Sequence, residues 1–352
     1  MRLVREVKNT RPLLFSDGLL YCSRFNEILT TSDLGQHFES IGKIILRPSI
    51  ITKASSLQPL FQRIVRSVVY RARKTQNGNL ILIFRGGIFL LRKNETRADC
   101  VFPVNRGSRP VSLAVSNTNF TVFGEYHSNE ERGPMSIYGS QDDGETWNAV
   151  MTFLDKEIRH IQGISFDPWD NCFWICCGDI ENENRLIRAT VDFSQTETVL
   201  QSGQLNRFYS INVQKDHLIL STDTPLEDNF VFRYDKKSGK KDILAKIQNS
   251  SFYYAQVNDL NFISTNAEPS AKNDYLYSHI WAGRTYDDTW KHLMSFPVDF
   301  YSRHSPISGF FQFSRIFFPD GENTTGFLVC YGLGIKDYDN SMLVYELSPS
   351  AK

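Results

Sequence analysis

Short hairpin turns recur along the whole chain, and this repetition limits the fold more than any other sequence feature. Each turn is small or polar and joins two apolar, strand-forming runs. The turns are Ser16-Asp17-Gly18, Gln76-Asn77-Gly78, Asn117-Thr118-Asn119, 167–171, Lys215-Asp216-His217, 258–261 and Pro319-Asp320-Gly321. Turns of this composition favour β-hairpins, and their return every ~40–60 residues indicates a repeat architecture. The chain is therefore expected to be all-β.

Each repeat is long enough for four strands, so we expect seven four-stranded blades of a single β-propeller domain spanning 1–352. The expected blades are 11–46, 60–104, 108–154, 158–203, 205–249, 251–300 and 308–347. A six-bladed arrangement is the alternative if 1–60 is irregular. Residues 2–8 are expected to pair with the last blade and close it, because an unpaired sheet edge is a liability.

The composition suits such a core and excludes several classes of partner. Hydrophobic residues make up 41% of the 352 residues, and 39 basic residues balance 39 acidic ones. This balance argues against a nucleic-acid partner. No apolar run approaches the ~18 residues that span a membrane, and the N-terminus lacks a signal sequence. We therefore expect no membrane insertion, a cytoplasmic location and buried, free cysteine thiols.

The stretch 140–148, Ser-Gln-Asp-Asp-Gly-Glu-Thr-Trp-Asn, is the most specific motif. Asp142 can accept hydrogen bonds from amides of its own turn, Gly144 allows a positive φ, and Trp147 can anchor the next strand. An ordinary Asp-Gly hairpin is the alternative. Weaker copies lie in the same phase of other repeats, at 31–38, 190–196, 233–239 and 285–290.

The pattern Ser-x-Asp-x-Gly-x-Thr-Trp resembles the Asp-box, the turn motif of sialidase-superfamily propellers. The same repeat also occurs in photosystem assembly factors, sorting receptors and xyloglucanases, so the resemblance does not fix an activity. It implies that the motif has an architectural role. Asp142 is then not expected to be catalytic.

Strand order sorts the remaining residues by blade end. The first-to-second strand turns and the Asp-containing turns share one end, whereas longer charged loops share the other, where function usually resides. Six residues there are expected to bind substrate: Arg85, Arg109, Arg159, His160, Gln162 and Arg207. Each also has a structural alternative, such as a surface strand start or a satisfied core histidine. Glu181 and Glu183 are expected to be solvated.

The sialidase resemblance implies roles for the arginines and for further residues that are expected at the same blade end. Its arginines would hold a substrate carboxylate, and Asp179 or Asp223 would be the acid/base. Tyr209 or Tyr254, paired with Glu125, would supply the nucleophile. The two tyrosines could equally be packed aromatics, and Asp223 could form an Asx-turn before Pro225.

These observations give two hypotheses for function. The first is a sialidase-like glycoside hydrolase, or a lyase, that acts on an acidic sugar of a glycan. The second is a non-catalytic propeller that binds a glycan or a protein through the same blade ends. Neither hypothesis calls for a cofactor or a metal ion.

Overall fold

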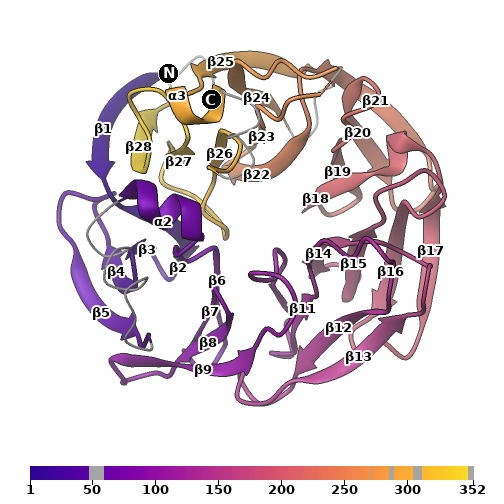
Figure 1. Cartoon of the computed structure of the whole chain (residues 1–352), viewed down its shortest axis with the longest axis horizontal. Helices are drawn as coiled ribbons and strands as arrows, with labels where there is room; N and C mark the ends of the chain where they lie inside the picture. Colours follow the sequence, from indigo (N-terminus) through magenta and orange to yellow (C-terminus); the bar gives the residue numbers. More distant parts are fainter. Residues whose placement is uncertain (47–58, 271, 285–288, 304–310, 348–352) are drawn as a thin grey trace. The chain divides into compact units, whose positions relative to one another are not determined.

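The computed structural model describes residues 1–46, 59–270, 272–284, 289–303 and 311–347 (Figure 1). Strands make up nearly all of the regular structure. The chain divides into two compact units. Unit 1 comprises Met1–Val69, Glu95–Ala98 and Gln248–Lys352, and unit 2 comprises Tyr70–Asn94 and Asp99–Ile247. Among the described helices, none is long and apolar enough to cross a membrane.

Unit 2 carries blades 2 to 5, each of four antiparallel strands that follow chain order. Blade 2 is β6 (Arg71–Lys74), β7 (Leu80–Phe84), β8 (Gly87–Leu91) and β9 (Arg97–Pro103). Blade 3 is β10 (Ala114–Val115), β11 (Thr121–Gly124), β12 (Met135–Ser140) and β13 (Asn148–Phe153). Blade 4 is β14 (Ile161–Asp167), β15 (Cys172–Cys177), β16 (Arg185–Thr190) and β17 (Thr196–Gln201). Blade 5 is β18 (Phe208–Val213), β19 (His217–Thr222), β20 (Asn229–Asp235) and β21 (Lys241–Ile247), after the 3₁₀ turn η1 (Gln204–Asn206).

Unit 1 carries blades 1, 6 and 7 and two short helices. Blade 1 is β2 (Arg11–Ser16), β3 (Leu19–Arg24), β4 (Glu27–Thr31) and β5 (Glu39–Ile44). Blade 6 is β22 (Ser251–Val257), β23 (Leu260–Thr265), β24 (Tyr277–Arg284) and β25 (Lys291–Pro297). Blade 7 is β26 (Arg315–Phe317), β27 (Phe327–Leu333), β28 (Ser341–Glu346) and β1 (Arg2–Lys8). The helices are α2 (Pro59–Val65) and α3 (Phe300–Arg303).

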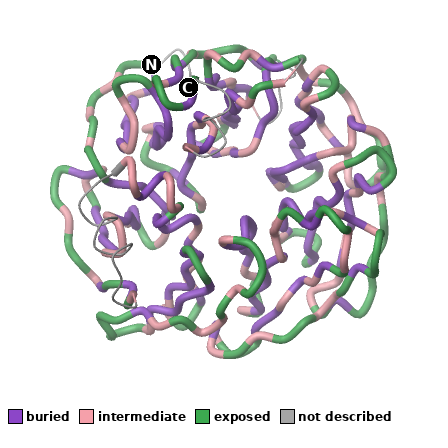
Figure 2. The backbone as a smooth tube through the Cα atoms, in the orientation of Figure 1, coloured by how far each residue is buried: buried purple, intermediate pink, exposed green. Residues whose placement is uncertain are grey.

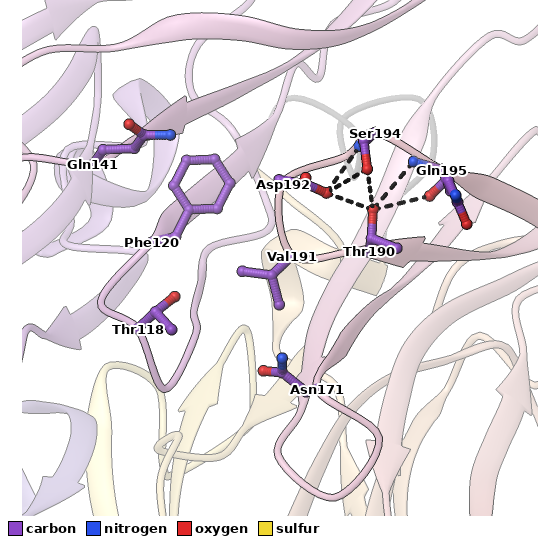
Figure 3. Close-up of a pocket in the computed structure, with 9 residues that line it drawn as sticks. All are labelled: Thr118, Phe120, Gln141, Asn171, Thr190, Val191, Asp192, Ser194 and Gln195. Atoms are coloured by element: carbon purple, nitrogen blue, oxygen red, sulfur yellow. Dashed lines mark hydrogen bonds between the residues drawn. The ribbon is translucent and has the colours of Figure 1, made fainter.

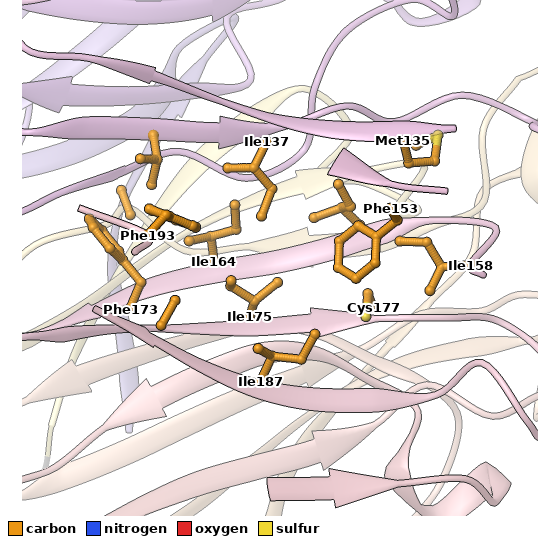
Figure 4. Packing of buried hydrophobic residues seen from close by; sticks show 14 of the residues in the cluster. Met135, Ile137, Phe153, Ile158, Ile164, Phe173, Ile175, Cys177, Ile187 and Phe193 are labelled. Carbon is orange, nitrogen blue, oxygen red and sulfur yellow. The ribbon is translucent and has the colours of Figure 1, made fainter. Parts of the chain in front are cut away.

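The second and third strands of the blades are buried and the fourth strands are mostly exposed, as Figure 2 shows by colour. In β15, Cys176 and Cys177 point to opposite faces because side chains alternate along a strand. Cys177 packs into the core between blades 3 and 4 (Figure 4), whereas Cys176 packs into the core between blades 4 and 5. Blade 4 is thus covered by apolar side chains on both faces. All six cysteines are free, but Cys100 is exposed, against the expectation that all would be buried.

The N-terminal strand β1 is the outer strand of blade 7. It runs antiparallel to β28, from the pair Arg2 and Glu346 to the pair Lys8 and Ser341. Val7 of β1 packs on a buried cluster that includes Met342 and Val344 of β28. Residues from the two ends of the chain therefore share one sheet.

The prediction of seven four-stranded blades is confirmed, with one difference at the second blade. We expected blade 2 to begin near residue 60, but the helix α2 covers Pro59–Val65 and the first strand begins at Arg71. Residues 47–58, which separate the expected bounds of blades 1 and 2, lie outside the described residues. Residues 97–98 of β9 also pair in parallel with Lys43 and Ile44 of β5.

Candidate functional site

The turn at 140–147 joins the third and fourth strands of blade 3 and is closed by its own side chains. The carboxylate of Asp142 accepts hydrogen bonds from the Thr146 amide (2.9 Å), the Thr146 hydroxyl (2.6 Å) and the Ser140 hydroxyl (2.8 Å). Gly144 has φ +90° and donates its amide to Ser140 Oγ (2.9 Å). Burial acts to raise the pKa of Asp142, but these hydrogen bonds together outweigh it and hold the pKa below its usual value.

Blade 1 repeats this geometry at the same place. Asp33 accepts hydrogen bonds from the amides of Gln36 (2.9 Å) and His37 (3.0 Å) and from the Thr31 hydroxyl (2.8 Å). The Gly35 amide donates to Thr31 Oγ1 (2.9 Å), as Gly144 does in blade 3. The two turns are therefore equivalent in structure, and they define what we call the turn end of each blade.

The opposite end, where the second strand meets the third, is called the loop end. In unit 2 it holds a chain of charged residues from blades 4 and 5. Asp179 follows β15, and its Oδ2 accepts a hydrogen bond from Arg159 Nη1 at 2.9 Å. Its Oδ1 lies 2.6 Å from Arg207 Nη2, which is also 3.5 Å from Asp223 Oδ2. Four residues that the sequence analysis proposed separately thus form one ion-pair network.

A fifth charged residue, Glu183, is bonded to the backbone of this network. Glu183 is buried, and its carboxylate contacts Arg132 and accepts a hydrogen bond from the Arg159 amide (2.9 Å). The expectation that Glu183 is a solvated loop charge is therefore wrong. Burial is tolerated because each carboxylate oxygen has a cationic or amide partner.

His160 and Gln162 precede and enter β14 beside the network, and both are buried. His160 Nδ1 is 3.9 Å from Asp179 Oδ2, and its ring lies 4.8 Å from that of Tyr126. Burial lowers the pKa of His160, although the charge of Asp179 acts in the opposite sense. Within the described part of the chain, Gln162 Oε1 has no hydrogen-bond partner.

Tyr209 and Arg109 meet a residue that the sequence analysis did not single out. The hydroxyls of Tyr209 and Tyr70 are 3.1 Å apart, and the Arg109 guanidinium lies 4.3 Å from the centre of the Tyr70 ring. Tyr70 and Tyr209 are both buried. Tyr70 directly precedes β6, within the range expected for blade 2, and no sequence pattern predicted that Arg109 would lie over its ring.

The remaining candidates have other surroundings. Glu125 pairs with Arg106 at 3.2 Å and accepts a hydrogen bond from the Ser136 amide at 2.8 Å, which caps the start of β12. Arg85 is exposed at the turn between β7 and β8. Tyr254 lies on β22 of unit 1 and is half-buried.

The arrangement of the network limits its chemistry. Both carboxylate oxygens of Asp179 already contact guanidinium groups, and Arg207 contacts two carboxylates. A general acid needs an oxygen within hydrogen-bond reach of the leaving group. The network is thus arranged to hold the loops of blades 4 and 5 in place, and its arginines are already paired with protein carboxylates.

No protein-family model and no curated protein sequence matches this chain. Solved structures are similar to it over most of its length. The WD40 repeats of RRP9 superpose with a TM-score of 0.56 at 12% identity, covering 98% of this chain and 100% of that one. The GH74 enzyme of Niastella koreensis gives 0.55 at 12% identity, covering 83% of this chain and 46% of the enzyme. A chain of the mitotic checkpoint complex gives 0.54 at 8% identity, covering 98% and 94%. Likeness at this level concerns the fold alone, and it places this chain among the β-propellers.

Proposed function

We propose that this protein is a non-catalytic β-propeller that binds a partner protein through the loop ends of blades 3, 4 and 5. The observation that carries the proposal is the distribution of exposed apolar side chains in unit 2. Leu154, Ile180 and Leu226 are 68%, 44% and 67% exposed, and each lies in a different loop of this end. At the turn ends of unit 2, the described residues include one large exposed hydrophobic side chain, Trp169.

This bias matters because exposed aliphatic side chains have no favourable contact with water, whereas an interface buries them. The three residues lie in loops that also carry charged and polar side chains, so these loops offer a partner both apolar and polar contacts. Interfaces between proteins have this composition. Unit 1 has the same bias, with exposed Tyr275, Phe300 and Tyr301 at the loop ends of its blades.

The charges around the three aliphatic residues indicate the character of the partner. Exposed carboxylates outnumber exposed cations in the loops at this end. The carboxylates are Glu130, Glu131, Asp155, Glu181 and Glu227, and the cations are Arg85, Arg106 and Lys156. A partner surface with apolar side chains flanked by lysine or arginine is complementary to this pattern.

The hydrolase hypothesis is the second candidate, and the contacts of Asp179 count against it. An acidic sugar would have to displace Asp179 or Asp223 from Arg207, which would take an ion-pair partner from a largely buried carboxylate. The equivalent turns of blades 1 and 3 do support a related proposal, that the chain is a divergent relative of the Asp-box propellers.

The proposal is tested by replacing the three aliphatic residues together. The variant Leu154→Asp/Ile180→Asp/Leu226→Asp should lose a polypeptide that co-purifies with the wild type. The matched control is Ile243→Asp on the outer strand β21, which is 59% exposed and should keep that polypeptide. Retention by the triple variant would contradict the proposed surface.

A parallel assay addresses catalysis. Fluorogenic nonulosonic-acid and uronic-acid glycosides should be released at background rate by the wild type and by Asp179→Asn alike. Release by the wild type that Asp179→Asn abolishes would establish the hydrolase instead.

A further inference from the structure

A pocket with a volume of about 650 Å³ opens at the turn ends of blades 3 and 4, away from the loop ends discussed above. Figure 3 shows Phe120 and Val191 facing the same space, with Gln141 on one side and the turn after β16 on the other. The lining residues are Thr118, Phe120, Gln141, Asn171, Thr190, Val191, Asp192, Ser194 and Gln195. Its size is within the range of small-molecule sites.

The neighbouring junction, between blades 2 and 3, shows what closes such a space. There Asp143 accepts hydrogen bonds from Asn77 and Asn119, and the Gln76 amide donates to Asn119 Oδ1 at 3.0 Å. Gly144 packs closely enough that a Cβ would lie 2.8 Å from Ile81 Cδ1. Side chains of three turns therefore join the two blades.

The junction between blades 3 and 4 lacks the residue that makes this bridge. Phe193 is the counterpart of Asp143 in the turn of blade 4, and both have a positive φ, of 59° and 62°. Phe193 packs inward, with its ring 5.5 Å from that of Phe173 and 6.4 Å from that of Phe120. The space that Asp143 closes between blades 2 and 3 therefore stays open, as the pocket, between blades 3 and 4.

Hydrogen-bonding groups without a protein partner line this space. The side-chain amides of Gln141, Asn171 and Gln195 make no hydrogen bond among the residues that the structure describes. Asp192 uses Oδ1 to accept from the Thr190 hydroxyl (2.7 Å) and the Ser194 hydroxyl (2.8 Å), which leaves Oδ2 toward solvent. Carboxamides both donate and accept, and a carboxylate accepts.

The lining also excludes several ligand classes. Asp192 is the charged residue among those that line the pocket, so an anion would meet a like charge and no cation. The lining residues come mostly from turns, so an extended peptide would find no open strand edge to pair with. Phe120 and Val191 provide an apolar floor for a ligand with a C–H face.

We propose that this pocket binds a neutral sugar. Hydroxyl pairs of the sugar would bond to the carboxamides and to Asp192 Oδ2, while its C–H face would lie on Phe120 and Val191. The site is separate from the loop ends in residues and in ligand class, so the proposal does not rest on the proposed function.

The test is saturation-transfer NMR followed by calorimetry with neutral saccharides: glucose, galactose, mannose, xylose, cellobiose, maltose and lactose. Gln141→Trp fills the pocket from an exposed position that has no hydrogen bond to lose, and Asp192→Asn keeps Oδ1 while removing the Oδ2 acceptor. We expect binding of at least one saccharide by the wild type and at least tenfold weaker binding by both variants. Asp142→Asn is the matched control, because it changes the equivalent carboxylate of blade 3, which does not line the pocket, and should bind like the wild type.

Three results would overturn the assignment. One is the absence of saturation transfer from every neutral saccharide. The second is unchanged affinity in Gln141→Trp, with folding verified by its melting temperature. The third is binding confined to glucuronic acid or glucosamine, tested in the same series, which would show a site selective for charge.

Discussion

Gly144 has a positive φ and also packs closely against blade 2, whereas Gly86 has a positive φ and no close neighbour. Comparing the two glycines therefore separates the effect of the backbone angle from the effect of packing. Their φ angles are +90° and +88°, but a Cβ on Gly86 would meet nothing within 4 Å, whereas on Gly144 it would meet Ile81. We expect Gly86→Ala to lower the free energy of unfolding by about 1 kcal/mol through the backbone alone. Gly144→Ala should cost about 1–3 kcal/mol more through overpacking. Urea unfolding of both variants measures the difference, and equal losses would show that the turn does not pack on blade 2.

Replacing Asp179 distinguishes a structural role of this carboxylate from a catalytic one. Asp179→Asn removes the charge that pairs with Arg159 and Arg207, so we expect it to lower the free energy of unfolding by about 1–3 kcal/mol. Asp155→Asn, at an exposed carboxylate, should change it by less than about 0.5 kcal/mol. Catalytic residues often sit at a cost to stability. An increase in stability of Asp179→Asn would therefore favour the hydrolase hypothesis.

His279 should make stability depend on pH. Burial, together with the neighbouring His292, lowers the pKa of His279 to about 4. The unfolded chain takes up a proton near pH 6.5 and the folded chain does not, so stability is complete above this pH. It should fall by about 1–3 kcal/mol as the pH drops from 6.5 to 4.

The check is urea unfolding across that range for the wild type and His279→Asn, which keeps a polar side chain near Ser295. The variant should show a shallower slope. Parallel curves for the two proteins would mean that His279 titrates alike in the folded and unfolded chain.

The sequence located some site residues well because strand order fixes which blade end they occupy. Asp179, Arg207 and Asp223 were expected at one end, and they meet there. Sequence spacing does not report burial, so Glu183 was misjudged as solvated. The partner of Tyr209, the Tyr70 hydroxyl, lies 139 positions away, and local patterns carry no information at that separation.

At the scale of elements, β1 is the strand whose role can be tested most simply. Val7 faces the buried cluster of blade 7, whereas Val4 of the same strand is 39% exposed. Val7→Asp should destabilise the protein by about 1–3 kcal/mol, because it buries a charge against apolar neighbours. Val4→Asp should have little effect, since it faces water. Thermal unfolding followed by circular dichroism compares them, and similar melting temperatures would argue that β1 does not contribute to the core.

Strands were easier to predict than the helix α2. Alternating apolar residues between turns predict a strand directly, and all seven expected turns separate strands in the structure. The seven residues of α2, Pro-Leu-Phe-Gln-Arg-Ile-Val, are few and mostly apolar, so periodicity alone does not distinguish helix from strand. Arg63 of this helix makes contacts with residues far away in the sequence, including an ion pair with Asp299 at 2.6 Å, and local sequence patterns do not report such contacts.

At the scale of the whole molecule, the count of blades follows from the sequence and the function does not. Seven turn signals correspond to seven four-stranded blades, because each repeat is one supersecondary unit that must cover its apolar faces with neighbours. The motif at 140–148 identifies the turn end of blade 3 and does not indicate a catalytic activity. Similar propellers include enzymes and members of protein assemblies, so the function depends on which side chains the loops present.

Site-specific photo-crosslinking tests most directly whether the loop ends of unit 2 bind a protein. A photoreactive amino acid is placed at Leu226 or at Trp169, which are both more than half exposed and lie at opposite blade ends. We expect a covalent adduct with a polypeptide from position 226 that disappears when Ile180→Asp is added, and no such adduct from position 169. An adduct from position 169 alone, or one from position 226 that survives Ile180→Asp, would contradict it.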